Sequence, residues 1–309
     1  MALKSQKEFS KYQIPIKFKK ALVIGMGQLG LPVATYVQNR GIETYGFDID
    51  QLAIERAQQL GIKTNSDFYG FDVFIICIST HKKDDIYSPD TSGIFAIAEK
   101  ISQEAKNGAL VSIESTVPKG TSRKVFEMLS HRLHVVHVPH RWYAPEEDVH
   151  GVNQLRVIGG VSKCCFELGL EFYGSSHEDI NKESNNQPPN SCVSNLEIPL
   201  HAVPEIEIAE LSKIVENSYR YVQIAFVEGL YMYCDRCNID FQQLREAINT
   251  KWNISLPEAR NGIRGHCLPK DVKMFLQTSK GNNNKVISGA VDTDAAYRKY
   301  IRFMDESKY

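Results

Sequence analysis

The sequence lacks a long apolar run and lacks an excess of charge. None of its apolar stretches approaches the roughly 18 residues that a membrane-spanning helix needs, and the formal net charge is −1. A nearly neutral chain has no general field that attracts nucleic acid or an anionic membrane surface. The lysine-rich first 20 residues lack the apolar segment of a secretory signal. We therefore expect a chain that binds neither nucleic acid nor membrane.

Cysteine provides no disulfide framework. The seven cysteines are odd in number and irregularly spaced, in a chain too long for a small disulfide scaffold. Free thiols indicate a reducing compartment, so we expect the cytoplasm. The spacing Cys234-x-x-Cys237 fits a metal-binding pair. It lies inside an expected helix with no second pair, however, and we interpret it as core packing and expect no metal.

Residues 20 to 172 alternate between short apolar runs and segments that suit helices. The apolar and charged fractions, 42% and 24%, are those of a globular protein. Repeated β–α units predict an α/β, Rossmann-like parallel sheet with helices on both faces. The expected strands are residues 20–25, 41–48, 72–78, 109–113, 134–138 and 156–159.

The first expected strand runs directly into Gly25-Met-Gly27-Gln28-Leu29-Gly30. This pattern is weak alone, but here a strand precedes it, a helix follows it, and Asp48 ends the next strand about 20 residues on. The glycines let a pyrophosphate approach a helix N-terminus, and Asp48 can accept hydrogen bonds from a ribose diol. An acid there repels a 2′-phosphate, which favours NAD over NADP. Asp50 is the alternate acid, and a glycine-rich turn without a ligand is the remaining alternative.

Polar residues follow several of the expected strands. Ligands of such sheets bind beyond the carboxyl ends of the strands. These ends carry Ser79-Thr80, Glu114-Ser115-Thr116 and Pro139-His140-Arg141. We expect Ser79, Thr80, Ser115 and Thr116 to line the cofactor site.

Residues 204 to 309 predict a separate all-α domain. Its first helix, about residues 204–236, would span on the order of 45 Å, so we expect it to link domains or to pack against a second subunit. Lys213 and Asn217 lie four residues apart and share one helix face, with a solvated polar stripe as the alternative. The expected domains are therefore residues 1–203, with a flexible insertion at 174–197 rich in Ser, Asn and Glu, and residues 204–309.

The segment Gly262-Ile-Arg264-Gly265-His-Cys267-Leu-Pro-Lys-Asp271 places a cysteine between two glycines and a proline. The glycines allow a tight turn, and the proline suits the first turn of a helix from 270 to about 280. Cys267 would then lie at a helix N-terminus, a setting that can lower a thiol pKa well below about 8.5. A small buried thiol is the alternative.

Taken together, five motifs resemble the UDP-glucose/GDP-mannose dehydrogenase family over about residues 20 to 280. They are the glycine motif with Leu31-Pro32, Cys77-Ile-Ser-Thr80, Glu114-Ser-Thr-Val-Pro-Lys-Gly-Thr121, Glu210-Leu-Ser-Lys213-x-x-x-Asn217 and Gly265-His-Cys267-Leu-Pro-Lys-Asp271. The resemblance implies an NAD-binding Rossmann domain and a central helical dimerisation domain. It also implies a homodimer that oxidises the C6 alcohol of a nucleotide sugar to a carboxylate with two NAD per turnover, as in polysaccharide biosynthesis. The sugar is expected to be UDP-linked, as in an enzyme similar to UDP-glucose 6-dehydrogenase.

The resemblance also assigns roles by position. Cys267 would be the nucleophile that forms a thiohemiacetal and then a thioester. Lys213 and Asn217 would stabilise the oxyanion, and Asp271 would orient water or the lysine. Thr116 would hold water or the sugar. Lys251, Arg264 and Gly265 would contact the substrate.

Three departures from the family pattern are visible. His140 stands where the family has a glutamate, and it could act as a base near neutral pH, with a loop histidine bonded to backbone as the alternative. Arg264 replaces a glycine. The C-terminal nucleotide-binding domain of the family does not follow, so we expect a short form whose nucleotide contacts come from elsewhere.

Two other functions remain open at this point. A two-electron dehydrogenase of the hydroxyacid type would use Lys213 and Asn217 and would not need Cys267. A non-catalytic NAD-binding scaffold would need neither reaction.

Overall fold

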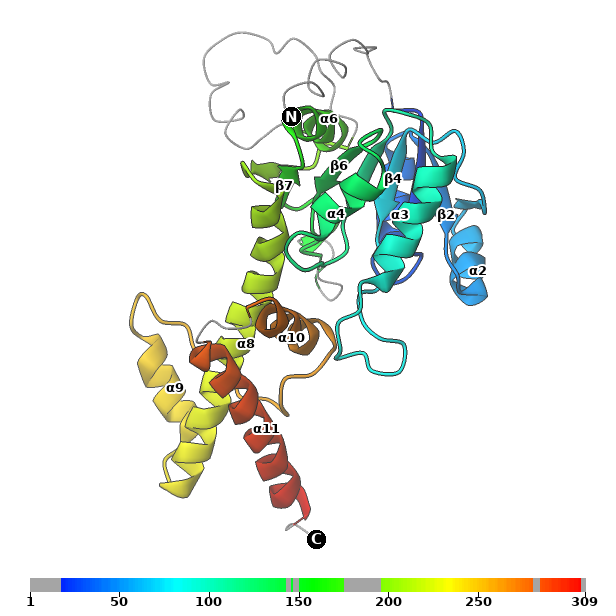
Figure 1. Ribbon diagram of the computed structural model, residues 1–309. Coiled ribbons are helices and arrows are strands. Elements are labelled where there is room, and N and C mark those ends of the chain that lie inside the picture. The colour runs from blue at the N-terminus through cyan, green and yellow to red at the C-terminus, as the bar shows by residue number, and fades with distance from the viewer. Residues whose placement is uncertain (1–17, 143–145, 147–149, 175–195, 280–283, 307–309) are drawn as a thin grey trace.

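The computed structural model describes residues 18–142, 146, 150–174, 196–279 and 284–306. A twisted sheet with helices on both faces forms one part, and a long helix leads from it to a helical part that carries the C-terminus (Figure 1). Most of the lysine-rich first 20 residues and nearly all of the expected insertion at 174–197 lie outside the described residues. Among the described residues, no helix is both long and apolar enough for a membrane crossing.

The sheet has eight strands in the order β3-β2-β1-β4-β5-β6-β7-β8. From β3 to β6 all neighbours are parallel. Since the chain winds from β1 outward to β3 and then returns to β4 on the other side, the strand order reverses beside β1, where such sheets bind ligands. The strands are β1 (Lys20–Ile24), β2 (Glu43–Phe47), β3 (Lys63–Thr64), β4 (Val73–Ile76), β5 (Leu110–Ile113), β6 (His134–His137), β7 (Arg156–Gly160) and β8 (Leu200–Ala202).

The Rossmann-like fold class is confirmed, with one correction to the parallel sheet. β7 pairs antiparallel with β6 and parallel with β8. Antiparallel neighbours need no helical crossover, and the sequence between residues 138 and 156 offered no helical pattern. The very short strands β3 and β8 were not expected.

Side chains of the central strands alternate between two apolar cores. Ala21 and Val23 of β1 pack on one face, and Leu22 and Ile24 pack on the other. This alternation follows from the period of two in a strand, and burial on both faces explains the continuous apolar runs. The helices of this part are α1 (Gly30–Asn39), α2 (Gln51–Gln59), α3 (Ser92–Glu104), α4 (Thr121–Met128) and α6 (Lys163–Tyr173).

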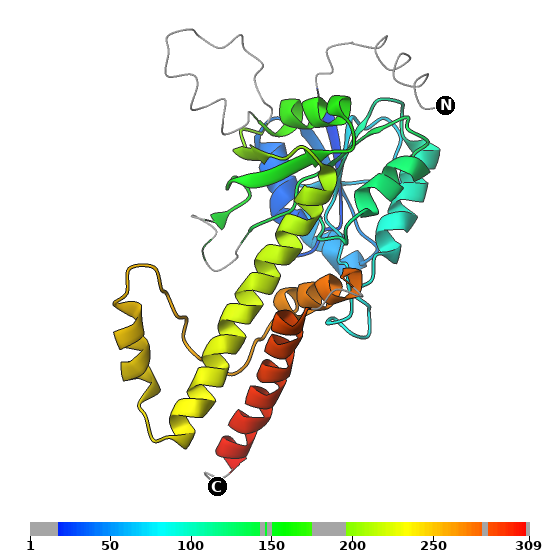
Figure 2. The same cartoon turned by 60° about the vertical axis from the view of Figure 1, so that its left-hand side comes forward.

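The helical part is built on α8 (Ile206–Arg236), which is 31 residues long. The helices α10 (Cys267–Thr278) and α11 (Lys285–Glu306) pack against it, while α9 (Phe241–Asn249) lies on its other side (Figure 2). Apolar side chains from all three packed helices form this core, among them Tyr221, Val272 and Ala290. The predicted division at residue 203 lies in the turn between β8 and α8.

Glu210 fixes α8 to the sheet part. Its buried carboxylate accepts hydrogen bonds from the backbone N–H of Gly120 at 2.5 Å and of Ser122 at 2.7 Å, at the start of α4. A carboxylate at a helix N-terminus satisfies donors that have no partner within the helix. Lys213 and Asn217, one and two turns further along α8, are thereby held near the carboxyl ends of the strands.

Candidate active site

The three glycines of the Gly25–Gly30 loop have different surroundings. A Cβ at Gly25 (φ +95°) would lie 2.8 Å from the carbonyl oxygen of Cys77, and one at Gly30 would lie 1.6 Å from that of Gly25. A Cβ at Gly27 would meet no atom within 4 Å. The outer glycines therefore permit close backbone packing, while Gly27 faces open space at the start of α1. No described side chain caps that helix start, so its N–H groups suit a phosphate.

The two candidate acids after β2 have different partners. Asp48 Oδ2 accepts a hydrogen bond from the Met26 backbone N–H at 2.6 Å, which places its carboxylate against the glycine loop. Asp50 instead caps α2 by accepting from the Leu52 N–H at 3.1 Å. The geometry therefore favours Asp48 over Asp50 as the group that faces a ribose beside the loop.

Hydrogen bonds from side-chain hydroxyl groups connect the segments that follow β4 and β5. Thr80 Oγ1 donates to the carbonyl oxygen of Thr116 at 2.8 Å, and Ser115 Oγ donates to that of Ile78 at 2.7 Å. The predicted cofactor residues Thr80, Ser115 and Thr116 thus lie together at one edge of the sheet. Ser79 is the exposed neighbour of Thr80.

Lys270 joins this edge to α10, a role that was not predicted from the sequence. Its side chain is buried, and Nζ donates to Thr80 Oγ1 at 3.1 Å. Nζ also lies 2.7 Å from Asp271 Oδ1. The sequence feature that could have pointed to Lys270 is its position beside Asp271 in the Cys-Leu-Pro-Lys-Asp run. A lysine is rarely buried without a partner, and the adjacent acid is such a partner.

Four of the predicted catalytic residues gather where α8 and α10 meet. Asp271 Oδ2 accepts a hydrogen bond from Asn217 Nδ2. Burial lowers the pKa of Lys213, while the negative charges of Asp271, Glu216 and Cys267 act in the opposite direction. Lys213, Asn217, Cys267 and Asp271 are therefore close enough to act on one substrate group.

Cys267 is the first residue of α10 and is exposed to solvent. The expectation of a lowered thiol pKa was wrong: burial by the surrounding protein and then the charge of Asp271 raise the pKa of Cys267, and Lys270 and Lys213 offset this only in part. Although the side chain reaches the surface, its environment still disfavours the anion. The free chain therefore carries mainly the thiol near neutral pH.

His140 lies in a buried network instead of beside Cys267. Its Nε2 contacts Glu114, whose carboxylate also pairs with Arg156 Nη1 at 3.1 Å and accepts from the hydroxyl of Tyr173. Burial and then the charge of Arg156 lower the pKa of His140 to about 4. Burial acts to raise the pKa of Glu114, but Arg156 and His140 outweigh it and the pKa falls to about 2. The imidazole is neutral and turned towards a carboxylate, which suits positioning better than proton transfer.

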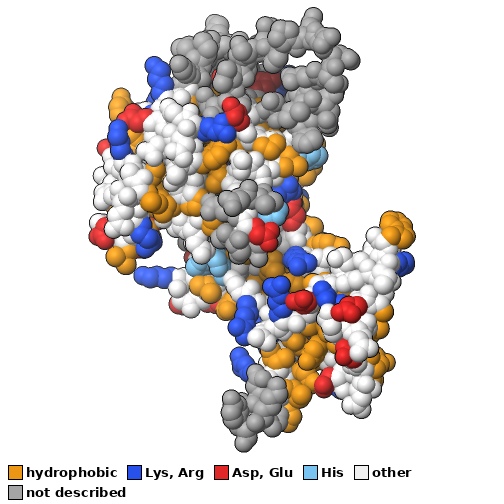
Figure 3. Space-filling model, turned by 180° about the vertical axis from the view of Figure 1, so that it is seen from behind, with side chains coloured by type: hydrophobic (Ala, Val, Ile, Leu, Met, Phe, Trp, Pro, Cys, Tyr) orange, Lys and Arg blue, Asp and Glu red, His pale blue; other side chains and the backbone are white. Residues whose placement is uncertain are grey.

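The predicted substrate-contact residues have no described contact with the group formed by Lys213, Asn217, Cys267 and Asp271. Arg264 is exposed, and its Nε donates to the carbonyl oxygen of Asn261 at 3.1 Å. Gly265 has φ +77° and open space around a built Cβ. Lys251 is exposed after α9, and its carbonyl accepts from the Ile254 N–H at 3.0 Å. Lys and Arg side chains nevertheless gather at the waist between the two parts (Figure 3).

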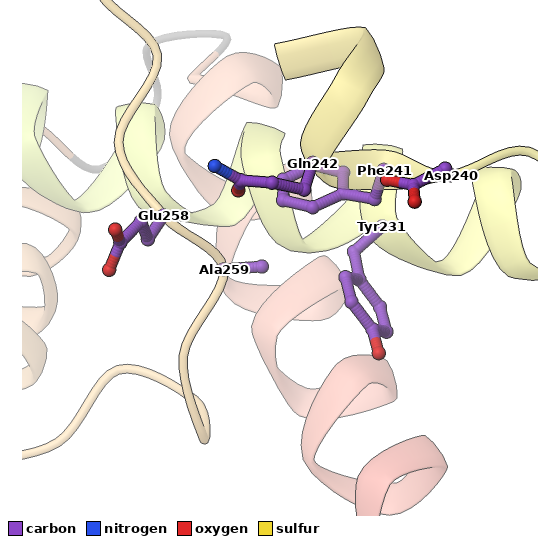
Figure 4. Close-up of a pocket in the computed structure, with 6 residues that line it drawn as sticks. All are labelled: Tyr231, Asp240, Phe241, Gln242, Glu258 and Ala259. Carbon is purple, nitrogen blue, oxygen red and sulfur yellow. The ribbon is translucent and has the colours of Figure 1, made fainter. Parts of the chain in front are cut away.

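A hollow of about 400 Å³ lies elsewhere, between α8, the start of α9 and the loop that follows it (Figure 4). Tyr231 comes from α8, and Glu258 and Ala259 come from the loop that passes beside it. None of the predicted site residues lines this hollow.

Comparison with known proteins matches both parts of the chain to one family. Residues 56–177 match the NAD binding domain of the UDP-glucose/GDP-mannose dehydrogenase family, and residues 207–295 match its central domain. The chain belongs to this family. The glycine loop and Asp48 precede the first matched range, and the fold places both at the strand ends of the family's NAD-binding domain.

Individual relatives are similar over most of the chain. A UDP-N-acetyl-D-mannosamine dehydrogenase of Methanococcus maripaludis is 27% identical over 92% of this chain and 66% of its own length. An NDP-N-acetyl-D-galactosaminuronic acid dehydrogenase of Ralstonia nicotianae is 26% identical over 93% of this chain and 71% of its own. The solved UDP-N-acetyl-mannosamine dehydrogenase of Staphylococcus aureus has 25% identity and a TM-score of 0.72, over 94% of this chain and 70% of that one. The chain thus spans about two thirds of the length of these family members.

We predict that the thiol of Cys267 is a weak nucleophile in the free chain. Because its pKa is raised, alkylation by iodoacetamide should reach half its limiting rate at a pH above that of free cysteine, about 8.5. Asp271→Asn should move that midpoint down, and Lys213→Met should move it up. The rate would be followed by mass spectrometry of the Cys267 peptide.

N-acetylcysteine in the same buffers provides the reference. A Cys267 midpoint at or below that of the reference would contradict the prediction, as would a Lys213→Met variant that alkylates at a lower pH than the wild type.

Proposed function

We propose that the chain is an NAD-dependent dehydrogenase that oxidises the C6 primary alcohol of a nucleotide sugar to a carboxylate through Cys267. One observation carries this proposal. The exposed thiol of Cys267, at the start of α10, lies beside Lys213 of α8. Three residues later on α10, Lys270 contacts Thr80 at the strand ends of the dinucleotide fold. A thiol, an amine and the cofactor crevice are thus joined by one short helix.

The residues present fit NAD. The open side of Gly27 and the start of α1 offer backbone N–H groups to the pyrophosphate. Asp48 lies against the same loop to receive a ribose, and Gln28, Leu29, Ser79 and Thr80 flank these positions. Bound there, NAD accepts the hydride in each oxidation.

The covalent steps take place at Cys267. The alcohol first loses a hydride and a proton to become an aldehyde, and the thiolate adds to the aldehyde carbon to form a thiohemiacetal. Loss of a second hydride and of the hydroxyl proton leaves a thioester, and water then releases the carboxylate and restores the thiol. The Lys213 ammonium and the Asn217 amide are placed to stabilise the oxyanion of the adduct and of the hydrolysis step.

Lys213 also offers a way to form the thiolate. Burial lowers the pKa of Lys213 while the pKa of Cys267 is raised. The lowered pKa of Lys213 makes the neutral amine that accepts the thiol proton more available, while the raised pKa of Cys267 makes the transfer itself less favourable than between the isolated groups. The transfer creates the thiolate and the ammonium together. Asp271 positions this pair through Asn217 and Lys270.

The remaining predicted residues receive less direct roles. Thr116, whose carbonyl oxygen accepts from Thr80 beyond the end of β5, would hold the attacking water or the sugar through its hydroxyl. Arg264 and Lys251 lie at the exposed side, where they are available to a diphosphate, and Gly265 leaves room for the sugar. His140 positions the Glu114 end of β5 and takes no proton from the substrate.

The relatives narrow the substrate class. Both curated relatives compared above act on N-acetylated amino sugars by name. We therefore propose a UDP-linked N-acetylhexosamine as the substrate in place of UDP-glucose.

The chain offers a surface for a homodimer along α8. Five exposed apolar residues on this helix are spaced by seven or four positions, which places them on one face. They are Ile208, Val215, Tyr219, Phe226 and Tyr233. We propose that this face packs against α8 of a second copy, because a contiguous apolar stripe of this length is rarely left in water.

The reaction stoichiometry tests the proposed function. A panel of UDP-N-acetylhexosamines and UDP-glucose would be incubated with NAD, and NADH and uronate would be counted together. We expect two NADH for each carboxylate, and we expect Cys267→Ser to reduce carboxylate formation by about a thousandfold or more, because the covalent nucleophile is lost. Cys237→Ser, an exposed thiol outside the site, should behave as the wild type.

One NADH for each product, with Cys267→Ser as active as the wild type, would instead indicate a two-electron dehydrogenase. No turnover with any sugar, together with measurable NAD binding, would indicate a scaffold.

We predict that Lys270 is needed for the cofactor end of the site. Lys270→Met keeps the length of the side chain but removes the contact with Thr80, so it should weaken NAD binding by about tenfold or more, as the loss of a buried charged hydrogen bond would. Isothermal titration with NAD measures this. Lys273→Met is the matched control, because Lys273 lies three residues after Lys270 on α10 and is exposed. Equal NAD affinities for the two variants would sink the assignment.

The homodimer is tested by sedimentation. Phe226→Asp and Tyr219→Asp place a charge in the stripe, where the wild-type residues are 60% and 65% exposed. Both should shift the sedimentation coefficient to that of a monomer at micromolar concentration. Tyr69→Asp, at an exposed tyrosine of the sheet part, should leave the dimer intact. A wild-type chain that sediments as a monomer would refute the proposed interface.

A further inference from the structure

A second cluster of reactive side chains lies at the opposite edge of the sheet. His134 is the first residue of β6, while the crevice residues follow the last residues of the strands. Since β7 runs antiparallel to β6, the chain returns to the start of β6, where the Val161 N–H donates to the carbonyl oxygen of Val135 at 3.1 Å. There α6 begins, with Cys164 and Cys165 in its first turn. Two adjacent thiols thus meet a histidine from a different element.

The distances suit one metal ion. One imidazole nitrogen of His134 and the two Sγ atoms of Cys164 and Cys165 all lie within 4.8 Å of one another. A tetrahedral Zn²⁺, with Zn–S of about 2.3 Å and Zn–N of about 2.0–2.1 Å, separates such ligand atoms by roughly 3.5–3.8 Å. The ligand atoms therefore lie within about 1 Å of the separations that a tetrahedral ion requires.

The thiols already interact as a unit. Ser162 Oγ lies 3.1 Å from the Sγ atoms of both Cys164 and Cys165. One hydroxyl thus holds both sulfur atoms together at the start of α6, where a metal ion can replace the thiol protons.

Access and surroundings also favour an ion. Cys164 is exposed, His134 is partly exposed and Cys165 is buried, so an ion can enter from solvent and still be held by the fold. The other described cluster of metal-ligating groups, formed by Cys77, Glu114 and His140, is fully buried. There the Arg156 guanidinium already neutralises the carboxylate, which leaves no charge for a metal.

We propose that His134, Cys164 and Cys165 form a binding site for a thiophilic cation such as Zn²⁺, with water as the fourth ligand. Two sulfur ligands and one imidazole select Zn²⁺ over Mg²⁺ or Ca²⁺, which prefer oxygen. The bound ion joins β6 to α6 at the edge of the sheet away from the cofactor crevice. The expectation of no metal rested on the Cys234/Cys237 spacing, and sequence spacing cannot show that the turn after β7 brings two cysteines to His134.

The reduced, metal-free full chain would be titrated with Co²⁺ as a spectroscopic probe of the site. We expect one equivalent to produce a thiolate-to-cobalt charge-transfer band with the strong ligand-field bands of a tetrahedral site, and we expect Zn²⁺ to displace it. Cys164→Ser should remove most of the charge-transfer band. His134→Ala should weaken Zn²⁺ binding, measured by competition with a chromophoric chelator, by at least about tenfold, since even outer-shell changes cost that much.

The matched controls are Cys234→Ser, Cys237→Ser and Cys267→Ser, which should each retain the band. Circular dichroism would verify that Cys164→Ser, at an exposed position, and His134→Ala remain folded. A wild-type chain without a charge-transfer band would overturn the proposal. A band that survives Cys164→Ser, or that disappears with any control variant, would also overturn it, because the thiolates would then come from elsewhere.

Discussion

The buried pair of Lys270 and Asp271 is the interaction on which the arrangement of the site depends. Lys270 reaches the sheet through Thr80, and Asp271 reaches α8 through Asn217. The side chains are 6% and 1% exposed, so removal of either charge would leave the other buried without compensation, which typically costs about 3–5 kcal/mol. Three elements are thereby fixed around two adjacent residues, and Cys267, one turn earlier on α10, is fixed with them.

The same pair explains why the thiol is not activated in the free chain. A helix N-terminus stabilises an anion by about 0.3–1 kcal/mol at an exposed position, which is less than the 1.36 kcal/mol of a single pKa unit. Burial and the nearby Asp271 carboxylate act in the opposite direction and outweigh it. The group that positions Cys267 thus also suppresses its ionisation. Lys213 supplies the compensating positive charge, and a bound substrate that shields Asp271 would favour the thiolate further.

The sequence predicted the parts of this molecule that depend on local patterns. The strands and the long helix follow from the periodicity of apolar residues. The Gly25–Gly30 loop follows from its glycines, which are required only where the backbone turns tightly or packs closely. The direction of β7 could not be predicted, because it depends on whether the chain crosses over the sheet between residues 138 and 156. The burial of Lys270 could not be predicted either, because its partner Thr80 lies 190 residues away in the sequence. Its other partner, Asp271, is the adjacent residue and does not by itself indicate burial. The approach of His134 to Cys164 depends on the same unpredicted turn.

The buried network around Glu114 limits where a proton can go. Arg156 and His140 keep the pKa of the Glu114 carboxylate at about 2, and burial keeps the pKa of His140 at about 4. The Glu114 carboxylate is paired with a guanidinium, and the His140 imidazole is weakly basic. Both are therefore poor general bases at neutral pH, because Brønsted efficiency is highest for a pKa near the operating pH. Among the described residues near Cys267, Lys213 remains the group whose pKa is moved towards neutrality from above. We therefore propose that proton handling lies with Lys213 on α8, the helix that also carries the apolar stripe.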